Sequence, residues 1–321
     1  MGTRFATLTL NPAVDIACRA RSVQPTHKIR TVTERFDAGG GGINVARVLH
    51  ALGKDVVALV VAGGVTGRLI EELLDEAGVR RASVPIHERT RISMNVTEEA
   101  SGLEYRFVPE GPRITAHELD QVREAFHTID ADWLIASGSL PPGAPDGFYG
   151  EIAAAASARG QLFALDTSGE ALRLAAGKGI ELLKLSASEL AYLARRDLPD
   201  RRAQEAAVNS LLRSGVARTI AASFGVGGAV LATQEGLAWM PTIPVQVVSA
   251  VGAGDSFLAG LVAGLARGGE PSDALALGSA CGAAAVSGVG TAQVSRSRVD
   301  ELLAQTGRAR QAALVCSGQS L

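Results

Sequence analysis

The stretch Ser249-Ala-Val-Gly-Ala-Gly-Asp255-Ser-Phe257 decides how the rest of this chain is interpreted. Small residues precede an apolar run that favours a helix, and an aspartate stands in the first turn of that helix. The free N–H groups of a first turn and the helix dipole attract an anion, and glycine lets a phosphoryl group approach closely. The stretch therefore predicts a phosphate site, with the alternative that Asp255 only caps the helix after a flexible turn.

A second glycine cluster, Asp37-Ala-Gly-Gly-Gly-Gly-Ile-Asn44, also leads into a predicted helix. Four consecutive glycines cost conformational entropy, so the close approach of a ligand explains them better than a loose loop does. Neither cluster is a P-loop, which needs Gly-Lys-Ser/Thr, and neither is a dinucleotide fingerprint, because no acidic residue closes a following strand at the right distance. We predict a small-molecule site built from two separate glycine-rich turns.

Outward from these turns, short aliphatic runs alternate with longer stretches rich in alanine and leucine. This alternation predicts an α/β fold, a doubly wound and mostly parallel sheet flanked by helices. Predicted strands cover residues 5–10, 55–61, 133–136, 162–166, 182–185, 219–223 and 228–233. Predicted helices cover residues 42–52, 67–77, 115–126, 148–159, 169–176, 187–193, 203–214, 255–267 and 271–286.

Two regions, about 16–35 and 90–108, break this rhythm. In the second, Ile92, Met94 and Val96 alternate with other residues ahead of a turn-like Ala-Ser-Gly, which indicates a hairpin. We predict that both regions form a small β lid on a single domain of residues 1–308, with residues 309–321 as a weakly structured tail. The alternating apolar residues of the lid need a covering surface, which predicts dimerisation.

The composition excludes several classes of function. The 321 residues include 31 Lys and Arg against 33 Asp and Glu, a net charge of −2, so no basic field gathers nucleic acid or an anionic membrane. The three cysteines, Cys18, Cys281 and Cys316, are too few and too scattered to suggest a disulfide framework or a zinc site. The apolar runs are too short for a membrane span and no secretion signal is evident, which predicts a cytoplasmic protein.

The motifs Gly39–Asn44 and Ala250–Phe257 carry a resemblance to a known family. With them the chain resembles the ribokinase-like (PfkB) carbohydrate kinases from about Phe5 to about Leu303. Within that family it is most similar to the phosphosugar branch, and there to the minor bacterial 6-phosphofructokinases. Other segments that carry the likeness are Asn11–Asp15, Thr90–Arg91, Tyr105–Val108, Ser137–Gly143, Asp166–Leu172 and Ser223–Gly228.

The resemblance implies transfer of phosphate from ATP to a ketohexose phosphate, with fructose 6-phosphate as the expected acceptor and Mg²⁺ on the ATP phosphates. Asp255 matches the base that takes the proton from the acceptor hydroxyl, and the backbone of Gly252, Ala253 and Gly254 matches the anion hole. Fructose 1-phosphate and tagatose 6-phosphate stay open as acceptors, because they share most polar groups with fructose 6-phosphate. A weakly catalytic sensor of sugar phosphate or nucleotide is the alternative from another class.

The residues that match acceptor-binding positions of the family are Asp15, Lys28, Gly40, Gly41, Asn44, Arg91, Ser139 and Asp166. Lys28 and Arg91 match positions near the phosphate that the acceptor already carries, and a guanidinium holds phosphate with paired hydrogen bonds. Taken singly, both could be ordinary solvated charges, and Asp15 could be a turn residue. The resemblance also implies a homodimer formed through the β lid.

The residues that match nucleotide-binding positions are Lys184, Ser223, Gly225 and Gly228. The family commonly has Lys-Pro-Asn-x-x-Glu from the lysine onward, and its Asn and Glu act on the water shell of Mg²⁺. This chain keeps Glu189, for a contact through water, but has Leu185 and Ser186 in place of the Pro and Asn. Serine accepts a hydrogen bond from a metal-bound water but is shorter than asparagine, so the part of Ser186 in metal binding stays open.

Overall fold

A large sheet forms the centre of the computed structural model, which describes residues 2–288, 292 and 294–317. Within the described residues, adjacent strands of this sheet pair in parallel except at β11–β12 and β12–β13, which are antiparallel. In their order across the sheet, the strands are β13 (Gly236–Met240), β12 (Ala229–Thr233), β11 (Thr219–Ser223), β10 (Leu182–Ser186), β9 (Leu162–Asp166), β8 (Trp133–Ser137), β1 (Arg4–Thr9), β4 (Asp55–Ala62) and β5 (Arg81–Pro85).

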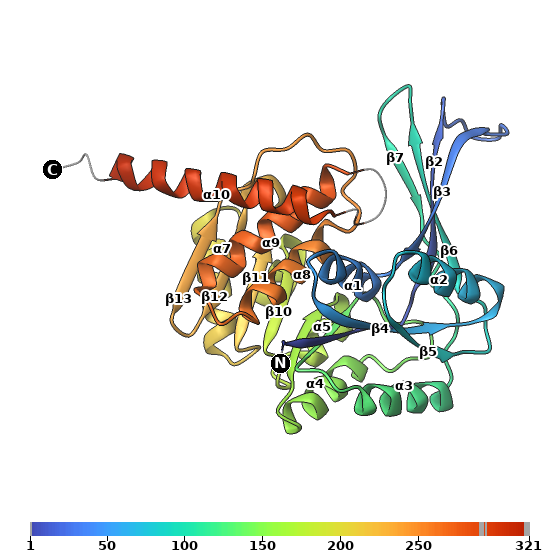
Figure 1. Cartoon of the computed structure of the whole chain (residues 1–321), viewed down its shortest axis with the longest axis horizontal. Coiled ribbons are helices and arrows are strands. Elements are labelled where there is room, and N and C mark those ends of the chain that lie inside the picture. The colour runs from blue at the N-terminus through green and yellow to red at the C-terminus, as the bar shows by residue number, and fades with distance from the viewer. Residues whose placement is uncertain (1, 289–291, 293, 318–321) are drawn as a thin grey trace.

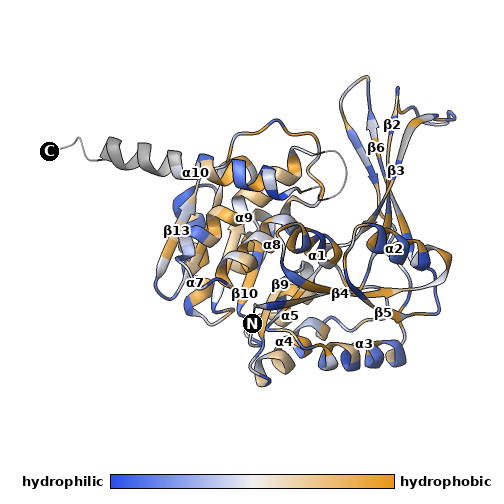
Figure 2. Ribbon diagram, in the orientation of Figure 1, coloured by the Kyte–Doolittle hydropathy of each residue, from blue (hydrophilic) through white to orange (hydrophobic). Residues whose placement is uncertain are grey.

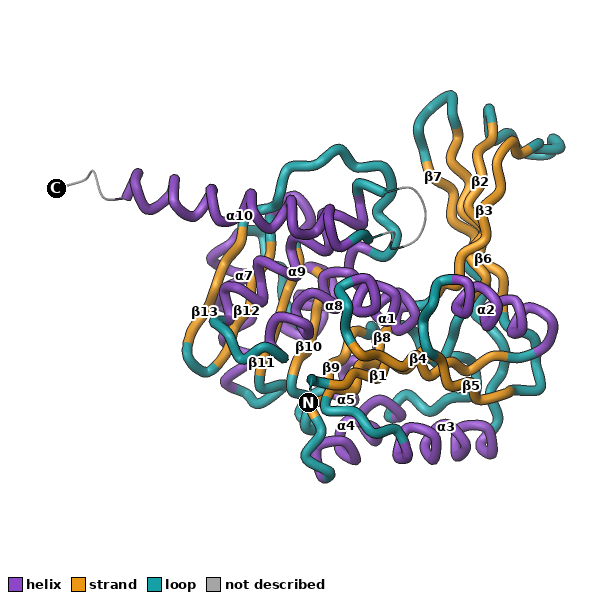
Figure 3. Tube along the Cα trace, viewed as in Figure 1, coloured by secondary structure: helices purple, strands orange, loops and turns teal. Residues whose placement is uncertain are grey.

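Helices cover both faces of this sheet, as Figures 1 and 3 show. One face carries α1 (Gly41–Ala51), α2 (Gly64–Glu76), α8 (Ala253–Leu265), α9 (Pro271–Val286) and α10 (Arg296–Ser317). The other carries α3 (Ala116–Thr128), α4 (Phe148–Ala158), α5 (Gly169–Ala175), α6 (Ala187–Ala194) and α7 (Arg201–Arg213). The predicted doubly wound α/β fold is therefore confirmed.

Two hydrophobic cores lie on the two faces of the large sheet, because successive strand residues point to opposite sides. In β4, for example, Val56, Ala58 and Val60 belong to the core under α1, whereas Leu59 and Val61 belong to the other. Figure 2 shows the same apolar character along the strands and along α8 and α9. Strands buried on both faces explain the unbroken aliphatic runs of the sequence.

A separate four-stranded sheet, called the lid here, projects from the carboxyl edge of the large sheet (Figure 1). Its order is β3 (Thr31–Gly39), β2 (Ala13–Ala20), β6 (Arg91–Glu98) and β7 (Glu104–Phe107), with β2 and β6 parallel and the outer pairs antiparallel. The two regions predicted to form a β appendage do meet in one sheet. The N-terminal region extends further than predicted, from Ala13 to Gly39, and so runs directly into α1.

The described structure also contains elements that the sequence did not predict. The strands β5 and β13 lie at the two edges of the large sheet, where a strand needs no long aliphatic run because one side stays open. Helix α10 includes the start of the segment from Ala309 that was predicted as a weakly structured tail, and continues to Ser317. Alanine, arginine, glutamine and leucine in that segment favour a helix. Residues 318–321 lie outside the described residues.

Within the described ranges, no helix combines the length and the apolar character that crossing a membrane requires.

Candidate active site

Helix α8 begins at Ala253, with Gly252 as its N-cap and Asp255 in its first turn. Gly252 has φ 78°, a left-handed conformation that glycine adopts without strain, and a Cβ there would lie 2.8 Å from the Cβ of Ala292. The N–H of Ala253 is already directed at Ala250 O, 3.4 Å away. The first turn of α8 therefore has the predicted form, and the N–H groups that follow Ala253 are the better placed to meet an anion.

The four-glycine cluster leads into α1, as predicted, but its glycines also have a packing reason. A Cβ on Gly39 would lie 2.1 Å from Asp15 Oδ2, one on Gly41 would lie 2.2 Å from Ser137 Oγ, and one on Gly42 would lie 2.4 Å from Leu8 O. Neighbouring atoms of Asp15, Ser137 and Leu8 lie so close to these positions that a side chain larger than that of glycine would clash with them. Ligand approach alone, the predicted explanation, is therefore incomplete for this cluster.

Both glycine-rich turns meet at the carboxylate of Asp255. Asn44, on α1, donates from Nδ2 to Asp255 Oδ2 at 2.9 Å. Ser137, the last residue of β8, donates from Oγ to Asp255 Oδ1 at 2.8 Å. Two side chains from different elements therefore fix the plane of this carboxylate.

Asp255 lies at the junction of two cavities. The large cavity, about 670 Å³, lies between the lid and the body of the protein, and Asn44 lines it. Asp255 also lines the small cavity, about 150 Å³, together with Ser137, Asp166 and Glu189. Asp255 therefore lines both cavities.

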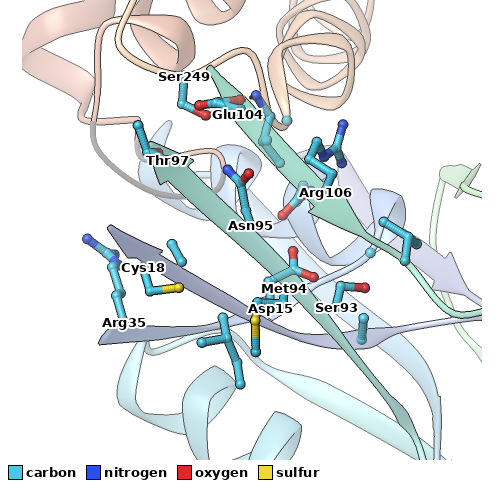
Figure 4. Close-up of a pocket in the computed structure, with 18 of the residues that line it drawn as sticks. Asp15, Cys18, Arg35, Ser93, Met94, Asn95, Thr97, Glu104, Arg106 and Ser249 are labelled. Carbon is cyan, nitrogen blue, oxygen red and sulfur yellow. Dashed lines mark hydrogen bonds between the residues drawn. The ribbon is translucent and has the colours of Figure 1, made fainter. Parts of the chain in front are cut away.

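The lid lines the large cavity with both polar and apolar side chains. Figure 4 shows Asp15, Ser93, Met94 and Asn95 along the lid strands, and Ser249 lines the same cavity. The residues of β6 alternate: Ser93 and Asn95 are half-buried, whereas Ile92 and Met94 are 44% and 40% exposed. The lid therefore lines the cavity with hydrogen-bonding side chains and with apolar ones such as Met94, whereas Ile92 is not part of the lining.

A buried ion pair stands behind the first turn of α8. Lys184 Nζ donates to Asp166 Oδ2 at 2.8 Å, and both side chains are almost fully buried. A Cβ on Gly254 would lie 2.8 Å from Lys184 Nζ, so the ammonium lies directly against the glycine-rich turn. A positive charge and the positive end of a helix therefore converge on one point, which favours a phosphate there.

This environment shifts the pKa values of both partners. Burial raises the pKa of Asp166 to about 6, against the opposing effect of Lys184 and with a further rise from the charges of Asp255 and Glu189. Burial by itself would lower the pKa of Lys184, but the attraction and hydrogen bond of Asp166 outweigh it and raise this pKa above its ordinary value. The lysine is therefore a fixed cation.

Comparisons with known proteins agree with this geometry. A model of the pfkB family of carbohydrate kinases matches residues 8–298. The chain belongs to the pfkB family. ATP-dependent 6-phosphofructokinase isozyme 2 from Mycobacterium tuberculosis is 41% identical to this pfkB-family chain over 301 residues, which make up 92% of this chain and 88% of that protein.

Solved structures of Escherichia coli phosphofructokinase-2 resemble this pfkB-family chain throughout. The crystal structure in complex with substrates and products aligns with TM-score 0.91 and 35% identity, over 95% of this chain and all of that one (100%). The crystal structure in complex with fructose-6-phosphate aligns with TM-score 0.89 and 34% identity, over 95% of this chain and 99% of that one.

Most of the family-matched residues come together around the two cavities. Those that line the large cavity are Asp15, Gly40, Gly41, Asn44, Arg91, Gly252 and Asp255, and those that line the small one include Ser139, Asp166, Glu189 and Asp255. Lys28 is exposed in the β2–β3 connection, among the residues that line neither cavity. Its predicted place beside the acceptor phosphate stays a prediction.

The predicted nucleotide segment follows β11. Ser223 ends that strand opposite Ser186 in the register with β10, and Gly225 begins a short 3-10 helix. Gly228 has φ 92°, and a Cβ there would lie 2.3 Å from Met240 O, which explains this glycine by packing. The three predicted residues lie outside both cavities, at the same carboxyl edge of the sheet as the small one.

The departure from the family pattern at the start of α6 preserves the local structure. Ser186 accepts from the backbone of Glu189 at 3.3 Å, and Glu189 Oε2 accepts from the backbone of Ser186 at 2.7 Å, which makes a reciprocal capping box. Leu185, in place of the common proline, is fully buried in the core. Serine thus keeps the helix start and the position of Glu189.

The small cavity has donors that suit a hydrated magnesium ion. Carboxylates of Asp166, Glu189 and Asp255 surround it, and hard oxygen ligands of this kind are what Mg²⁺ prefers. Across the described part of the chain, His, Cys, Asp and Glu nowhere gather in a group of three close enough to ligate a metal directly. The contact of Glu189 with Mg²⁺ through water stays a prediction.

Several residues of the site were not singled out from the sequence as functional. Ser137 contacts Asp255, and Arg35, Asn95 and Arg106 line the large cavity. Ser137 does stand in the segment Ser137–Gly143 that carried the resemblance, and a small polar residue at the carboxyl end of a buried strand is a usable signal. Whether Arg35, Asn95 and Arg106 point into the cavity depends on the register of the lid strands, and the sequence pattern does not predict that register.

Proposed function

We propose that this chain transfers the γ-phosphoryl group of ATP to the primary hydroxyl of a ketohexose phosphate, and that fructose 6-phosphate is the acceptor. The observation that carries the proposal is the position of Asp255, which lines both cavities. An acceptor in the large cavity and the terminal phosphate of ATP at the α8 turn would meet at that carboxylate. The relatives named for phosphofructokinase activity support this choice of acceptor.

Asp255 would act as the general base. Its carboxylate takes the proton from the primary hydroxyl while that oxygen attacks the γ-phosphorus, and the bond between the γ-phosphorus and the bridging oxygen breaks to release ADP. Lys184 and the first turn of α8 stabilise the charge on the transferred group. Glu189 would hold Mg²⁺ through water, and this ion would supply charge neutralisation on the ATP phosphates when bound.

Arginines in the large cavity support an acceptor that already carries phosphate. Arg19, Arg35, Arg91 and Arg106 all line it. Arg91 donates to Asn11 O at 2.8 Å and to Pro109 O at 2.7 Å, which fixes the guanidinium at the base of the lid. Burial lowers the pKa of Arg91, and the negative charge of Asp15 opposes this. An unphosphorylated sugar would not need so many cations.

The lid supports the proposal of a homodimer. Outside the lining of the large cavity, the lid exposes Phe36, Ile92 and Phe107, which are 43–57% exposed. These three side chains do not line the large cavity, so they are free to be covered without blocking it. We propose that the same face of a second copy covers them.

Steady-state kinetics with Mg·ATP and a panel of acceptors tests the proposed function. The expected result is ADP release with kcat/KM highest for fructose 6-phosphate and lower for fructose 1-phosphate, tagatose 6-phosphate and unphosphorylated fructose. A higher kcat/KM for either other sugar phosphate would change the acceptor but keep the chemistry. Binding of these sugars without any ADP release would overturn the kinase proposal.

A further inference from the structure

The hydroxyl of Ser137 lies next to the carboxylate of Asp255, the proposed base. Ser137 is 1% exposed and donates to Asp255 Oδ1 at 2.8 Å. Its backbone is fixed by the register of β8 with β9, in which Ser137 pairs with Asp166. The donor therefore comes from the rigid carboxyl edge of the large sheet and not from a mobile loop.

Packing leaves little freedom for this side chain. A Cβ on Gly41 would lie 2.2 Å from Ser137 Oγ and 2.8 Å from Ser137 Cβ, so the start of α1 presses directly on the hydroxyl. Gly138, the next residue, has φ 112° and turns the chain away from the strand. A side chain held by packing on one side and by a hydrogen bond on the other is a preorganised donor.

The two donors to Asp255 divide its oxygens between the two cavities. Asn44, the partner of Oδ2, lines the large cavity, and Ser137, the partner of Oδ1, lines the small one. Because Asn44 lines the large cavity, we assign its partner Oδ2 to the acceptor side. A carboxylate oxygen has lone pairs for a second hydrogen bond, so Oδ2 can accept from a substrate hydroxyl while Asn44 remains in place.

We propose that Ser137 is a positioning residue for the transfer step, which holds Asp255 Oδ1 so that Oδ2 points at the acceptor hydroxyl. The inference rests on the proposed kinase function. Ser137 makes no contact with the acceptor in this arrangement, because it acts through Asp255. Its removal leaves both substrates bound but lets the carboxylate rotate away from the geometry that the reaction needs.

Ser137→Ala in the full-length chain tests this. We expect kcat to fall about 10- to 100-fold while KM for ATP and for fructose 6-phosphate stays within about 3-fold. The matched control is Thr7→Val, which removes another fully buried strand hydroxyl, on β1. That variant is expected to keep kcat within about 2-fold of the wild type. If Ser137→Ala does not fold, as judged by its thermal midpoint, Ser137→Gly carries the same prediction.

A double-mutant cycle separates positioning from a general structural effect. In the Asp255→Asn background, Ser137→Ala is expected to change the residual rate less than about 2-fold, because the group it positions is already gone. Three results would each overturn this role. The first is an unchanged kcat in Ser137→Ala, and the second is a rise in both KM values as large as the fall in kcat. The third is a fall in rate from Ser137→Ala that is as large in the Asp255→Asn background as in the wild type. Wild-type protein without kinase activity would instead overturn the proposed function, so the two failures are distinguishable.

Discussion

The side-chain amide of Asn44 donates to the carboxylate of Asp255 at 2.9 Å, across a sequence separation of 211 residues. This hydrogen bond joins the starts of α1 and α8, the two helices that follow the glycine-rich turns. It also connects the wall of the large cavity to Asp255, which lines both cavities. The acceptor site and the proposed base are therefore a single hydrogen-bonded unit.

Asn44→Ala is expected to disturb both roles of this residue. The acceptor loses a polar partner and Asp255 loses one of its two donors, so kcat falls about 10- to 100-fold and KM for fructose 6-phosphate rises, while KM for ATP stays near the wild-type value. Steady-state kinetics with each substrate varied in turn measures this. Asn209→Ala, on α7, is the control and keeps wild-type values. A variant with normal kcat would contradict the link between the two residues.

Gly254→Ala is expected to damage the phosphate site. The new methyl group would lie 2.8 Å from Lys184 Nζ and displace the ammonium from the turn, so kcat falls at least about 100-fold. Gly269→Ala is the matched control, because a Cβ there has nothing within 4 Å. Rates at saturating ATP and fructose 6-phosphate check the prediction. Equal activity of the two variants would argue against a phosphate at this turn.

Asp166 is expected to make stability depend on pH. Its pKa is raised from 3.8 to about 6 in the folded chain, so between these values the folded state holds a proton that the unfolded state has lost. This contribution to the free energy of unfolding is full below pH 3.8 and declines as pH rises towards 6, by up to about 3 kcal/mol in all.

Urea unfolding of wild type and Asp166→Asn at several pH values from 4.5 to 7 measures this contribution. The asparagine variant does not titrate, so its stability is expected to gain relative to the wild type as pH rises to about 6 and to level off above that. A difference in the free energy of unfolding that is constant across this range would show that Asp166 keeps an ordinary pKa.

Arg91 and Lys28 are expected to differ in how much they hold the acceptor phosphate. Arg91 lines the large cavity and is fixed by two backbone carbonyls, whereas Lys28 is exposed in the β2–β3 connection. Arg91→Ala therefore raises KM for fructose 6-phosphate at least about 10-fold, and Lys28→Ala raises it less. Neither change is expected to alter KM for ATP. The reverse order of the two effects would place the phosphate outside the single-chain cavity.

Ile92→Glu is expected to break the proposed dimer. Ile92 is 44% exposed on the outer face of the lid, and burying a charge against a second copy would cost several kcal/mol. Light scattering at micromolar concentration should show a dimer for the wild type and a monomer for the variant. Tyr192→Glu, on α6 and 46% exposed, is the control and should remain dimeric. A monomeric wild type would remove this proposal.

The features of the site that the sequence predicted lie at the starts of strongly patterned helices. Asp255 and Asn44 each follow a glycine-rich turn, and the apolar pattern behind each turn predicts the helix that holds them. The parallel sheet brings such turns to one edge, so their meeting could be expected once the fold class was recognised. The same argument covers Lys184 and Asp166, which lie at corresponding places on neighbouring strands.

The remaining features depend on spatial relationships that periodicity does not encode. Ser137 reaches Asp255 only because β8 lies where α8 begins, and the inward direction of Asn95 follows from the register of β6 with β2. The sequence also does not predict that Gly41 packs against β8 and Gly42 against β1. From the sequence alone, the approach of a ligand is the explanation for these glycines. Edge strands such as β5 were missed because half-exposed strands lack a strong pattern.

The central claim is that Asp255 takes the proton from the acceptor hydroxyl. A rapid-quench measurement of a single turnover, with enzyme in excess over labelled Mg·ATP and saturating fructose 6-phosphate, tests it most directly. For Asp255→Asn we predict that ATP still binds with near wild-type affinity while the rate of phosphoryl transfer falls about 10³-fold. Transfer by that variant at the wild-type rate would contradict the account.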